Sequence, residues 1–167
     1  MSVNYVQKLY HVAITVDNID EAMKFYCDVL GLHTLGSLRG EESDGALLGF
    51  PGQRIKINAE HLVGEDSDNA TVIDLIEFIV PGTLEGKGPV TEMNRIGIDR
   101  LAFDVKNLDE LYATLKSRDD IHFICEPLIL NKPTGGFFKA ITFRDPYGIT
   151  MEFLESFDEL PEGCTVA

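Results

Sequence analysis

Cysteine and basic residues are both scarce in this sequence. The three cysteines, Cys27, Cys125 and Cys164, are widely scattered and form no Cys-x-x-Cys pair. Neither a disulfide framework nor a thiolate zinc site is therefore expected. Lysine and arginine total 14 against 28 aspartate and glutamate residues, which gives a net charge of −14. Such a charge repels nucleic acid and anionic lipid surfaces, so neither is an expected partner.

Long hydrophobic runs are missing as well. No segment approaches the roughly 20 apolar residues needed to span a bilayer, and the first ten residues lack a basic start followed by an apolar stretch. A cytoplasmic protein without a membrane partner is expected. The glycine-rich segment 81–89 lacks the Lys-Ser/Thr ending of a phosphate loop, which argues against nucleotide binding. The length of 167 residues and the hydrophobic fraction of 44% are typical of one folded globular domain.

The sequence contains an internal repeat. HVAITVDNIDE at His11–Glu21 and RLAFDVKNLDE at Arg100–Glu110 share Ala, Val, Asn, Asp and Glu at the same spacing. Each copy begins with the apolar residues of a strand and continues into a helix, for which Asn18 and Asn107 are the predicted N-caps. Gly31 is the predicted left-handed end of the first helix. A repeat of this kind predicts two similar modules.

The two halves also end alike. Ile76-Glu77-Phe78 and Met151-Glu152-Phe153 each place one glutamate in an apolar strand. Ahead of the second glutamate, Asp145-Pro146-Tyr147-Gly148 has the residues of a tight turn, which predicts a hairpin with Phe138–Phe143. We expect a single domain over 1–167.

The parts of that domain follow from the repeat. Residues 9–80 form the first module and 98–155 the second, with a linker at 81–97 and an acidic, partly ordered tail at 156–167. The first half is longer, and its extra residues are predicted at 38–51. Within this insertion, 40–45 has the composition of a loop and 46–50 that of a short helical turn that could wall a pocket.

Charged residues that interrupt the apolar strands are the candidates for chemistry. Burying a carboxylate without a partner costs several kcal/mol, so Glu77 and Glu152 should face a cation, a metal or water. His11 and Arg100 open the corresponding first strands of the two halves. His61 is a weaker candidate, because Ile55–His61 alternates like a strand and one of its faces could line a cavity.

These motifs resemble those of the vicinal oxygen chelate superfamily, the group of glyoxalases, bleomycin-resistance proteins and extradiol dioxygenases. The resemblance rests on HVAITV, on Asp28-Val29-Leu30-Gly31-Leu32 and on the segment Phe143–Glu152. It extends from about Leu9 to Glu155. It implies an α+β fold of two tandem β-α-β-β-β modules that form a curved, eight-stranded incomplete barrel around a pocket.

The resemblance also implies a site. Metal ligands in this superfamily come from the first and fourth strands of both halves, which by position are His11, Glu77, Arg100 and Glu152. Arginine departs from the pattern, because its guanidinium group is permanently charged and cannot ligate a metal. In one interpretation, His11, Glu77 and Glu152 hold Fe, Mn, Ni, Co or Zn while Arg100 binds a carboxylate or phosphate of the substrate. In the other, Arg100 pairs with Glu77 and Glu152 and replaces the metal.

Three functions remain in order of preference. The first is a metal-dependent lyase, isomerase or epimerase acting on a small molecule chelated through adjacent oxygens, with Glu77 or Glu152 as the base. The second is a metal-free resistance or sequestration protein, which Arg100 favours. A ring-cleaving dioxygenase ranks third, because familiar ones are often longer and use two histidines and one glutamate. A homodimer is compatible with all three.

Overall fold

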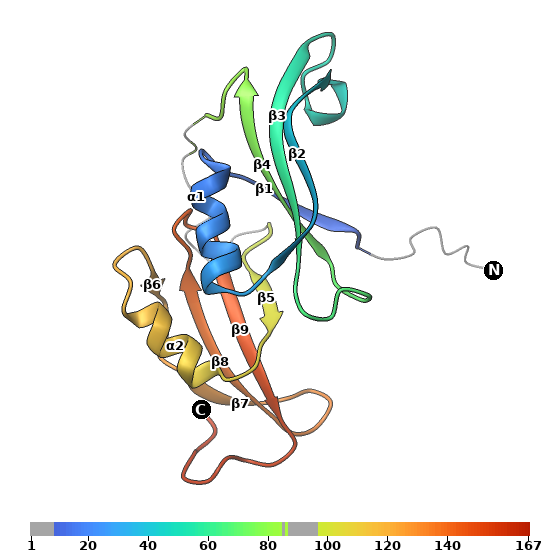
Figure 1. Ribbon diagram of the computed structural model, residues 1–167. Helices are drawn as coiled ribbons and strands as arrows, with labels where there is room; N and C mark the ends of the chain where they lie inside the picture. Colours follow the sequence, from blue (N-terminus) through green and yellow to red (C-terminus); the bar gives the residue numbers. More distant parts are fainter. Residues whose placement is uncertain (1–8, 85, 87–96) are drawn as a thin grey trace, which may run out of the picture. The chain divides into compact units, whose positions relative to one another are not determined.

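A computed structural model describes residues 9–84, 86 and 97–167. The chain divides into two compact units, residues 1–85 and 86–167. Each unit has its own β-sheet and its own helix (Figure 1). The predicted α+β class and the repeated strand-helix-strand order are therefore confirmed. Most of the predicted linker, 81–97, lies outside the described residues. No described helix is long and apolar enough to cross a membrane.

The first unit contains a four-stranded sheet with the order β1-β4-β3-β2. Its strands are β1 (His11–Thr15), β2 (His33–Asp44), β3 (Arg54–Val63) and β4 (Val72–Val80). The first strand runs parallel to β4, and the other neighbours are antiparallel. In this register Asp74 of β4 lies opposite Ala13 of β1 on one side and His61 of β3 on the other.

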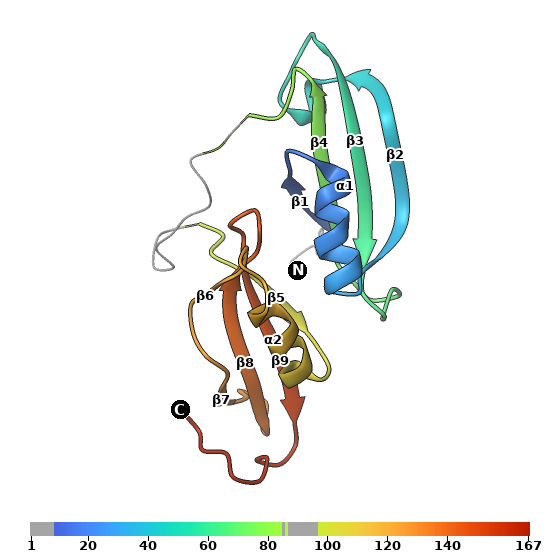
Figure 2. The ribbon, with the colours of Figure 1, turned by 60° about the vertical axis from the view of Figure 1, so that its left-hand side comes forward.

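The helix of the first unit begins where the sequence predicts. Asn18 is its N-cap, and the side-chain oxygen accepts hydrogen bonds of 3.0 Å from the N–H groups of Asp20 and Glu21. Helix α1 (Ile19–Met23) continues as a π-helical segment, η1 (Lys24–Val29). Gly31 follows with a φ of +75°, which confirms the predicted left-handed end. Figure 2 shows α1 against one face of the sheet, where it contacts β3 and β4.

The predicted insertion contains more strand than expected. Residues 40–44 belong to β2, so the loop predicted there is wrong. The register between β2 and β3 shifts between Leu38 and Glu41, and Gly40 has a φ of +65° at that point. This irregularity in the pairing allows Gly40, with its left-handed backbone conformation, to lie inside a paired strand. The predicted helical turn is confirmed as η2 (Ala46–Leu48), after which Phe50 packs against the buried Ile55, Ile57, Ala59 and Ile76.

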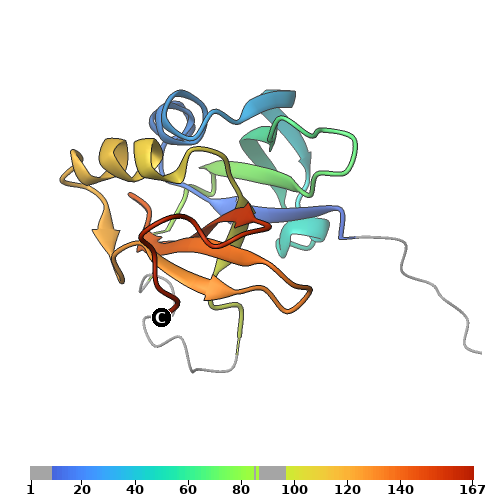
Figure 3. The ribbon, with the colours of Figure 1, turned by 90° about the horizontal axis from the view of Figure 1, so that it is seen from below.

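The second unit has a five-stranded sheet with the order β5-β9-β8-β6, and β7 also pairs with β8. The strands are β5 (Leu101–Asp104), β6 (His122–Phe123), β7 (Leu128–Asn131), β8 (Phe137–Arg144) and β9 (Thr150–Phe157). The additional strand arises because β6 and β7 both pair with β8 along different parts of its length. Helix α2 (Leu108–Lys116) lies along one face of the sheet (Figure 3).

Asn107 is the N-cap residue of α2, as predicted, but its side chain does not cap the helix. Asn107 adopts a left-handed conformation, with a φ of +55°, and its side chain makes no capping hydrogen bond. Instead, the carboxylate of Glu155 on β9 accepts hydrogen bonds from the N–H groups of Asn107 and Leu108, at 2.9 and 3.1 Å. A carboxylate at this end also complements the helix dipole. The cap is therefore supplied by a strand distant in sequence.

The predicted hairpin between β8 and β9 is confirmed. Asp145 begins the turn, and its side chain accepts hydrogen bonds from the N–H groups of Tyr147 and Ile149. The tail differs from its prediction, since β9 extends through Phe157. The N–H of Ala167 then donates to the carbonyl oxygen of Ile129 at 2.9 Å, which attaches the last residue to β7.

Candidate functional site

The two faces of the first sheet carry different charged residues. Arg39 donates to Asp20 of α1 at 3.1 Å and to Glu60 of β3 at 2.6 Å. Glu60 therefore faces α1, and it also accepts hydrogen bonds from the hydroxyl groups of Ser37 and Thr34. Successive side chains of a strand point to opposite faces. His61, the next residue of β3, thus lies on the face away from α1.

Asp74 lies directly opposite His61 on that outer face. Nε2 of His61 is 3.3 Å from Oδ1 of Asp74, and the Asp74 side chain is only 10% exposed. Despite this approach, Oδ1 is buried and has no hydrogen-bond partner within the described part of the chain. The contact is an ion pair when the imidazole of His61 is protonated. It leaves the carboxylate poorly compensated for its burial.

His11 belongs to the same face. It lies two residues before Ala13, which is opposite Asp74, so the side chains of His11 and Asp74 point to the same side of the sheet. The ring centroids of His11 and His61 are 6.4 Å apart. Burial raises the pKa of Asp74 above its usual value, while positive charge on His61 and His11 and a hydrogen bond from the His61 side chain act in the opposite direction.

The sequence predicts that Glu77 lies with His11, but the structure does not bring the two side chains together. It lies opposite Asn58, whose side-chain amide donates to Oε2 of Glu77 at 2.9 Å. Asn58 and Glu60 are two residues apart on β3, so Glu77 is on the face that α1 covers. His11 and Glu77 therefore lie on opposite faces of the first sheet.

Arg100 and Glu152 lie together in the second unit, as the sequence anticipated. Nε of Arg100 is 3.1 Å from Oε2 of Glu152, and Nη1 is 3.1 Å from a carboxylate oxygen of Asp99. The interaction with Glu152, followed by that with Asp99, raises the pKa of the guanidinium group above its usual value. Ala102 lies opposite Glu152 in the pairing of β5 with β9.

This pairing identifies the true counterpart of Glu152. Ala13 and Ala102 are equivalent residues of the repeat, and they lie opposite Asp74 and Glu152 respectively. Asp74 therefore occupies the place of Glu152, while Glu77 corresponds to the helix-capping Glu155. The sequence pattern did not reveal Asp74, because Val72–Val80 is apolar almost throughout and does not show which residues share a face. Matching Ile73-Asp74-Leu75 to Met151-Glu152-Phe153 would have found it.

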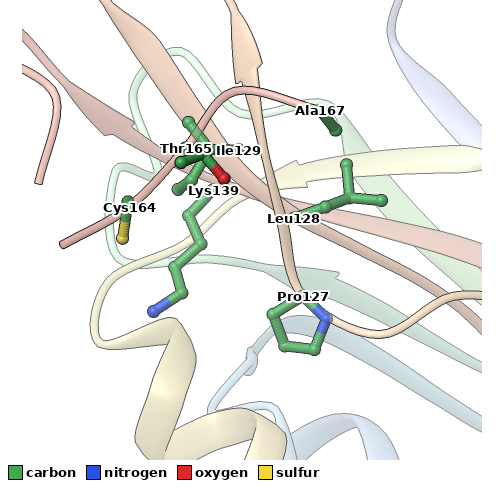
Figure 4. Close-up of a pocket in the computed structure, with 7 residues that line it drawn as sticks. All are labelled: Pro127, Leu128, Ile129, Lys139, Cys164, Thr165 and Ala167. Atoms are coloured by element: carbon green, nitrogen blue, oxygen red, sulfur yellow. The ribbon is translucent and has the colours of Figure 1, made fainter.

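Two surface hollows lie elsewhere in the second unit. One, of about 340 Å³, is formed where the C-terminal residues pass β7 (Figure 4), and its lining consists of Pro127, Leu128, Ile129, Lys139, Cys164, Thr165 and Ala167. The other, of about 420 Å³, is lined by Asn107, Asp109, Glu110, Glu155 and Phe157. Neither hollow is lined by Arg100 or Glu152.

The charged side chains do not form a ready metal cluster as they stand. Across residues 9–84, 86 and 97–167, no group of three or more His, Cys, Asp or Glu side chains is arranged to hold a metal ion. The donor types on the outer face of the first sheet nevertheless suit a divalent ion, because imidazole and carboxylate are its ordinary ligands. The buried, unpartnered Oδ1 of Asp74 is the atom that such an ion would satisfy.

One comparison with known proteins identifies a family, and another finds the same fold. The family model described as the glyoxalase/bleomycin resistance protein/dioxygenase superfamily matches residues 8–153. No curated protein matches the sequence. A glyoxalase family protein from Bacillus cereus is similar in structure, with 21% identity, a TM-score of 0.75, and coverage of 94% of this chain and 99% of that one.

Two other solved structures share the fold. A glyoxalase/dioxygenase from Nostoc punctiforme has 21% identity and a TM-score of 0.56, with 93% of this chain and 99% of that chain covered. The trypanothione-dependent glyoxalase I of Leishmania major has 18% identity and a TM-score of 0.58, with 90% and 87% covered. At these identities the likeness concerns the fold.

Proposed function

This chain belongs to the glyoxalase/bleomycin resistance protein/dioxygenase superfamily, and from that membership we propose that it is a metal-dependent lyase, isomerase or epimerase. Its substrate would be a small molecule that binds through two neighbouring oxygens. The first unit would hold the ion with His11 and Asp74. Asp74 takes the role that the sequence analysis gave to Glu77.

The observation that carries this proposal is the state of the Asp74 carboxylate. It is buried on the same face of the sheet as His11, and one of its oxygens lacks a hydrogen-bond partner in the described structure. Its counterpart Glu152 is satisfied by Arg100 at 3.1 Å. A buried carboxylate of this kind costs stability, and groups whose pKa is shifted by burial cluster at functional sites.

The other residues have roles that do not require the ion. When bound, a divalent ion supplies Lewis-acid stabilisation to a substrate enolate. Arg100 would attract an anionic oxygen of the substrate, because 37% of its side chain is exposed beside Glu152. Glu152 remains the candidate base for proton transfer. Glu77 is left out of the chemistry, since Asn58 holds it on the face covered by α1.

Metal content of the purified protein tests the proposal. Protein prepared without chelator should contain close to one equivalent of a divalent metal, and Asp74→Asn should lose most of it. Glu77→Gln is the matched control, because it changes a neighbouring β4 carboxylate on the opposite face and should keep the metal. Loss of metal in Glu77→Gln with retention in Asp74→Asn would restore the original assignment.

An activity measurement then tests the reaction class. Small 2-oxo and 2-hydroxy compounds are incubated with the metal-loaded protein in deuterated water, and NMR follows exchange of the hydrogen next to the carbonyl group. Exchange that disappears in Glu152→Gln supports enolate chemistry. Consumption of dioxygen without exchange would instead point to the dioxygenase branch of the family.

A metal-free binding protein is the second candidate. The Arg100–Glu152 ion pair favours it, because an arginine in the place of a ligand histidine neutralises the carboxylate without an ion. In that case the wild-type protein would contain no stoichiometric metal even after incubation with Fe²⁺, Mn²⁺, Ni²⁺, Co²⁺ or Zn²⁺. The function would then be sequestration of a small ligand.

A further inference from the structure

We infer that Arg144 and Thr150 of the second unit form, together with Arg100, a binding subsite for an anionic group of the substrate, a carboxylate or a phosphate. The inference rests on the proposed function in one respect, since that function makes the bound anion part of a substrate. It adds two residues that are not among the candidates identified from the sequence.

Arg144 and Thr150 lie directly opposite each other, at the turn end of β8 and β9. The residue before Arg144, Phe143, packs against the ring of Phe123, which in turn contacts Tyr112 of α2. Phe143 is therefore on the face that α2 covers. Because successive side chains of a strand point to opposite faces, Arg144 lies on the face away from α2. Thr150 shares that face, since residues directly opposite in an antiparallel pair point to the same side.

Arg100 approaches the same place from the other side of β9. It immediately precedes β5, whose parallel pairing with β9 begins at Met151, so the chain brings Arg100 beside Thr150. The guanidinium group reaches Glu152 at 3.1 Å, and Glu152 lies two residues after Thr150 on the same face. Thr150 is thus flanked by an arginine on each side, Arg144 at the end of β8 and Arg100 at the start of β5.

The hydroxyl group of Thr150 is the observation that points to a ligand. The residue is only 2% exposed, and its Oγ1 is buried without a hydrogen-bond partner among the described residues. A buried hydroxyl without a partner is unfavourable, and native structures contain few of them. Because threonine is short, a ligand atom reaches this hydroxyl only between the two longer arginine side chains. One bound group would then contact all three residues.

The donors at this place select an anion. A guanidinium group carries only donors and a permanent charge, and its planar shape matches the oxygens of a carboxylate or a phosphate. The hydroxyl of Thr150 is able to add one more donor. Asp99 and Glu152 already contact Arg100, and Arg144 brings the formal charge of these four side chains to zero. The group therefore does not repel an anion through a net negative charge.

The position of the subsite relative to Glu152 narrows the substrate class. Residues two apart on a strand are separated by roughly 7 Å, which the side chain of a glutamate partly spans. An anionic group bound at Thr150 would therefore hold the carbon atoms next to it close to Glu152, the proposed base. The substrate expected from this arrangement is a small acid, such as a 2-oxo or 2-hydroxy acid, whose reacting C–H bond lies near its anionic group.

Anion binding to the full chain tests the inference. In chelator, NMR titrations of the ¹⁵N-labelled protein use glycolate, inorganic phosphate and, as a neutral analogue of glycolate, ethylene glycol. The wild type should bind at least one anion more tightly than ethylene glycol, and the preferred anion distinguishes a carboxylate from a phosphate subsite. Arg144→Gln and Thr150→Val should each weaken binding at least about 10-fold, because each loses a hydrogen bond to a charged group. Thr150→Ser keeps the hydroxyl and should bind like the wild type.

Arg118→Gln is the matched control, because it removes the same charge from an arginine that pairs with Asp120 after α2. It should keep the affinity of the wild type. Equal weakening in Arg118→Gln and Arg144→Gln would reveal an effect of net charge alone and overturn the subsite. Circular dichroism checks folding. If Arg144→Gln does not fold, Arg144→Lys replaces it and should also bind more weakly, since lysine lacks the planar pair of donors.

The outcomes are independent of the metal. A wild type that contains metal but binds neither anion overturns the subsite and leaves the metal-dependent function standing. A wild type that binds an anion through Arg144 and Thr150 but takes up no metal supports the subsite and overturns that function.

Discussion

Asp74 and Glu152 occupy equivalent places in the two units, but among the described residues only Glu152 has an arginine at ion-pair distance. Each carboxylate lies opposite the alanine that the repeat conserves in the first strand, Ala13 or Ala102. Arg100 approaches Glu152 to 3.1 Å, whereas Asp74 faces His61 and has one carboxylate oxygen unpartnered within the described part of the chain. The same kind of substitution should therefore have opposite effects on stability in the two units.

Asp74→Asn should stabilise the metal-free protein. The change removes a charge that burial disfavours and keeps the shape of the side chain. We expect a gain of about 1 kcal/mol, which corresponds to an increase of roughly 2–4 °C in the midpoint of thermal unfolding for a chain of this size. The measurement is made at pH 8 in chelator, with Glu77→Gln as the control. A lower midpoint than wild type would show that Asp74 is stabilised by contacts not identified above.

Glu152→Gln should destabilise the protein slightly, because Arg100 loses its principal partner. Arg100 is 37% exposed, so water screens the pair and its coupling energy should be about 1 kcal/mol or less. A double-mutant cycle with Arg100→Met and Glu152→Gln, followed by denaturant unfolding, isolates that energy. Additive effects of the two single changes would mean that the pair contributes nothing to folding.

The stability gap between wild type and Asp74→Asn should depend on pH. Burial raises the pKa of Asp74, so the folded state keeps a proton that the unfolded state has already released. This contribution favours folding at low pH and is lost as the pH rises through the raised pKa. The wild type should thus be less stable than Asp74→Asn at pH 8, and the gap should close toward the ordinary pKa of aspartate. Unfolding curves in chelator from pH 8 to pH 4 measure it; a gap that widens on acidification contradicts the assignment.

Glu155→Ala should weaken the second unit. Its carboxylate accepts the two N–H groups at the start of α2, and loss of a helix cap costs about 0.5–2 kcal/mol. Thermal unfolding of Glu155→Ala should show a correspondingly lower midpoint. Glu159→Ala, which removes an exposed carboxylate a few residues later, should unfold like the wild type. Equal midpoints for the two variants would mean that the cap is dispensable.

The fold could be predicted because its signals are local and occur twice. The apolar opening strand, the Asn18 cap and the turn at Asp145 each depend on residues close in sequence. The N-cap position of Asn107 was also predicted, but the capping group was not, because it comes from Glu155 on a strand more than forty residues later. No local pattern near the helix contains that information.

The site was only partly predictable. The sequence analysis identified His11, Arg100 and Glu152 from interrupted strands, but it chose Glu77 over Asp74. Because β4 is apolar on both faces, only its pairing with β1 and β3 decides which carboxylate shares a face with His11. The alternation of side chains along β3 likewise decides on which face of the sheet His61 lies. The cytoplasmic location and the homodimer remain predictions.

The alternation of β3 has a consequence for insertions and deletions. Glu60 and His61 are neighbours in the chain, yet Glu60 is held beneath α1 by Arg39 and His61 is opposite Asp74 on the other face. Removing one residue from the strand before them would move each to the other face, placing the imidazole of His61 under the helix and the carboxylate of Glu60 on the outer face opposite Ile76. The register of β3 is thus a stricter requirement than the identity of its residues. Deleting one residue between Arg54 and Asn58 should lower the stability of the protein more than most substitutions in the same segment.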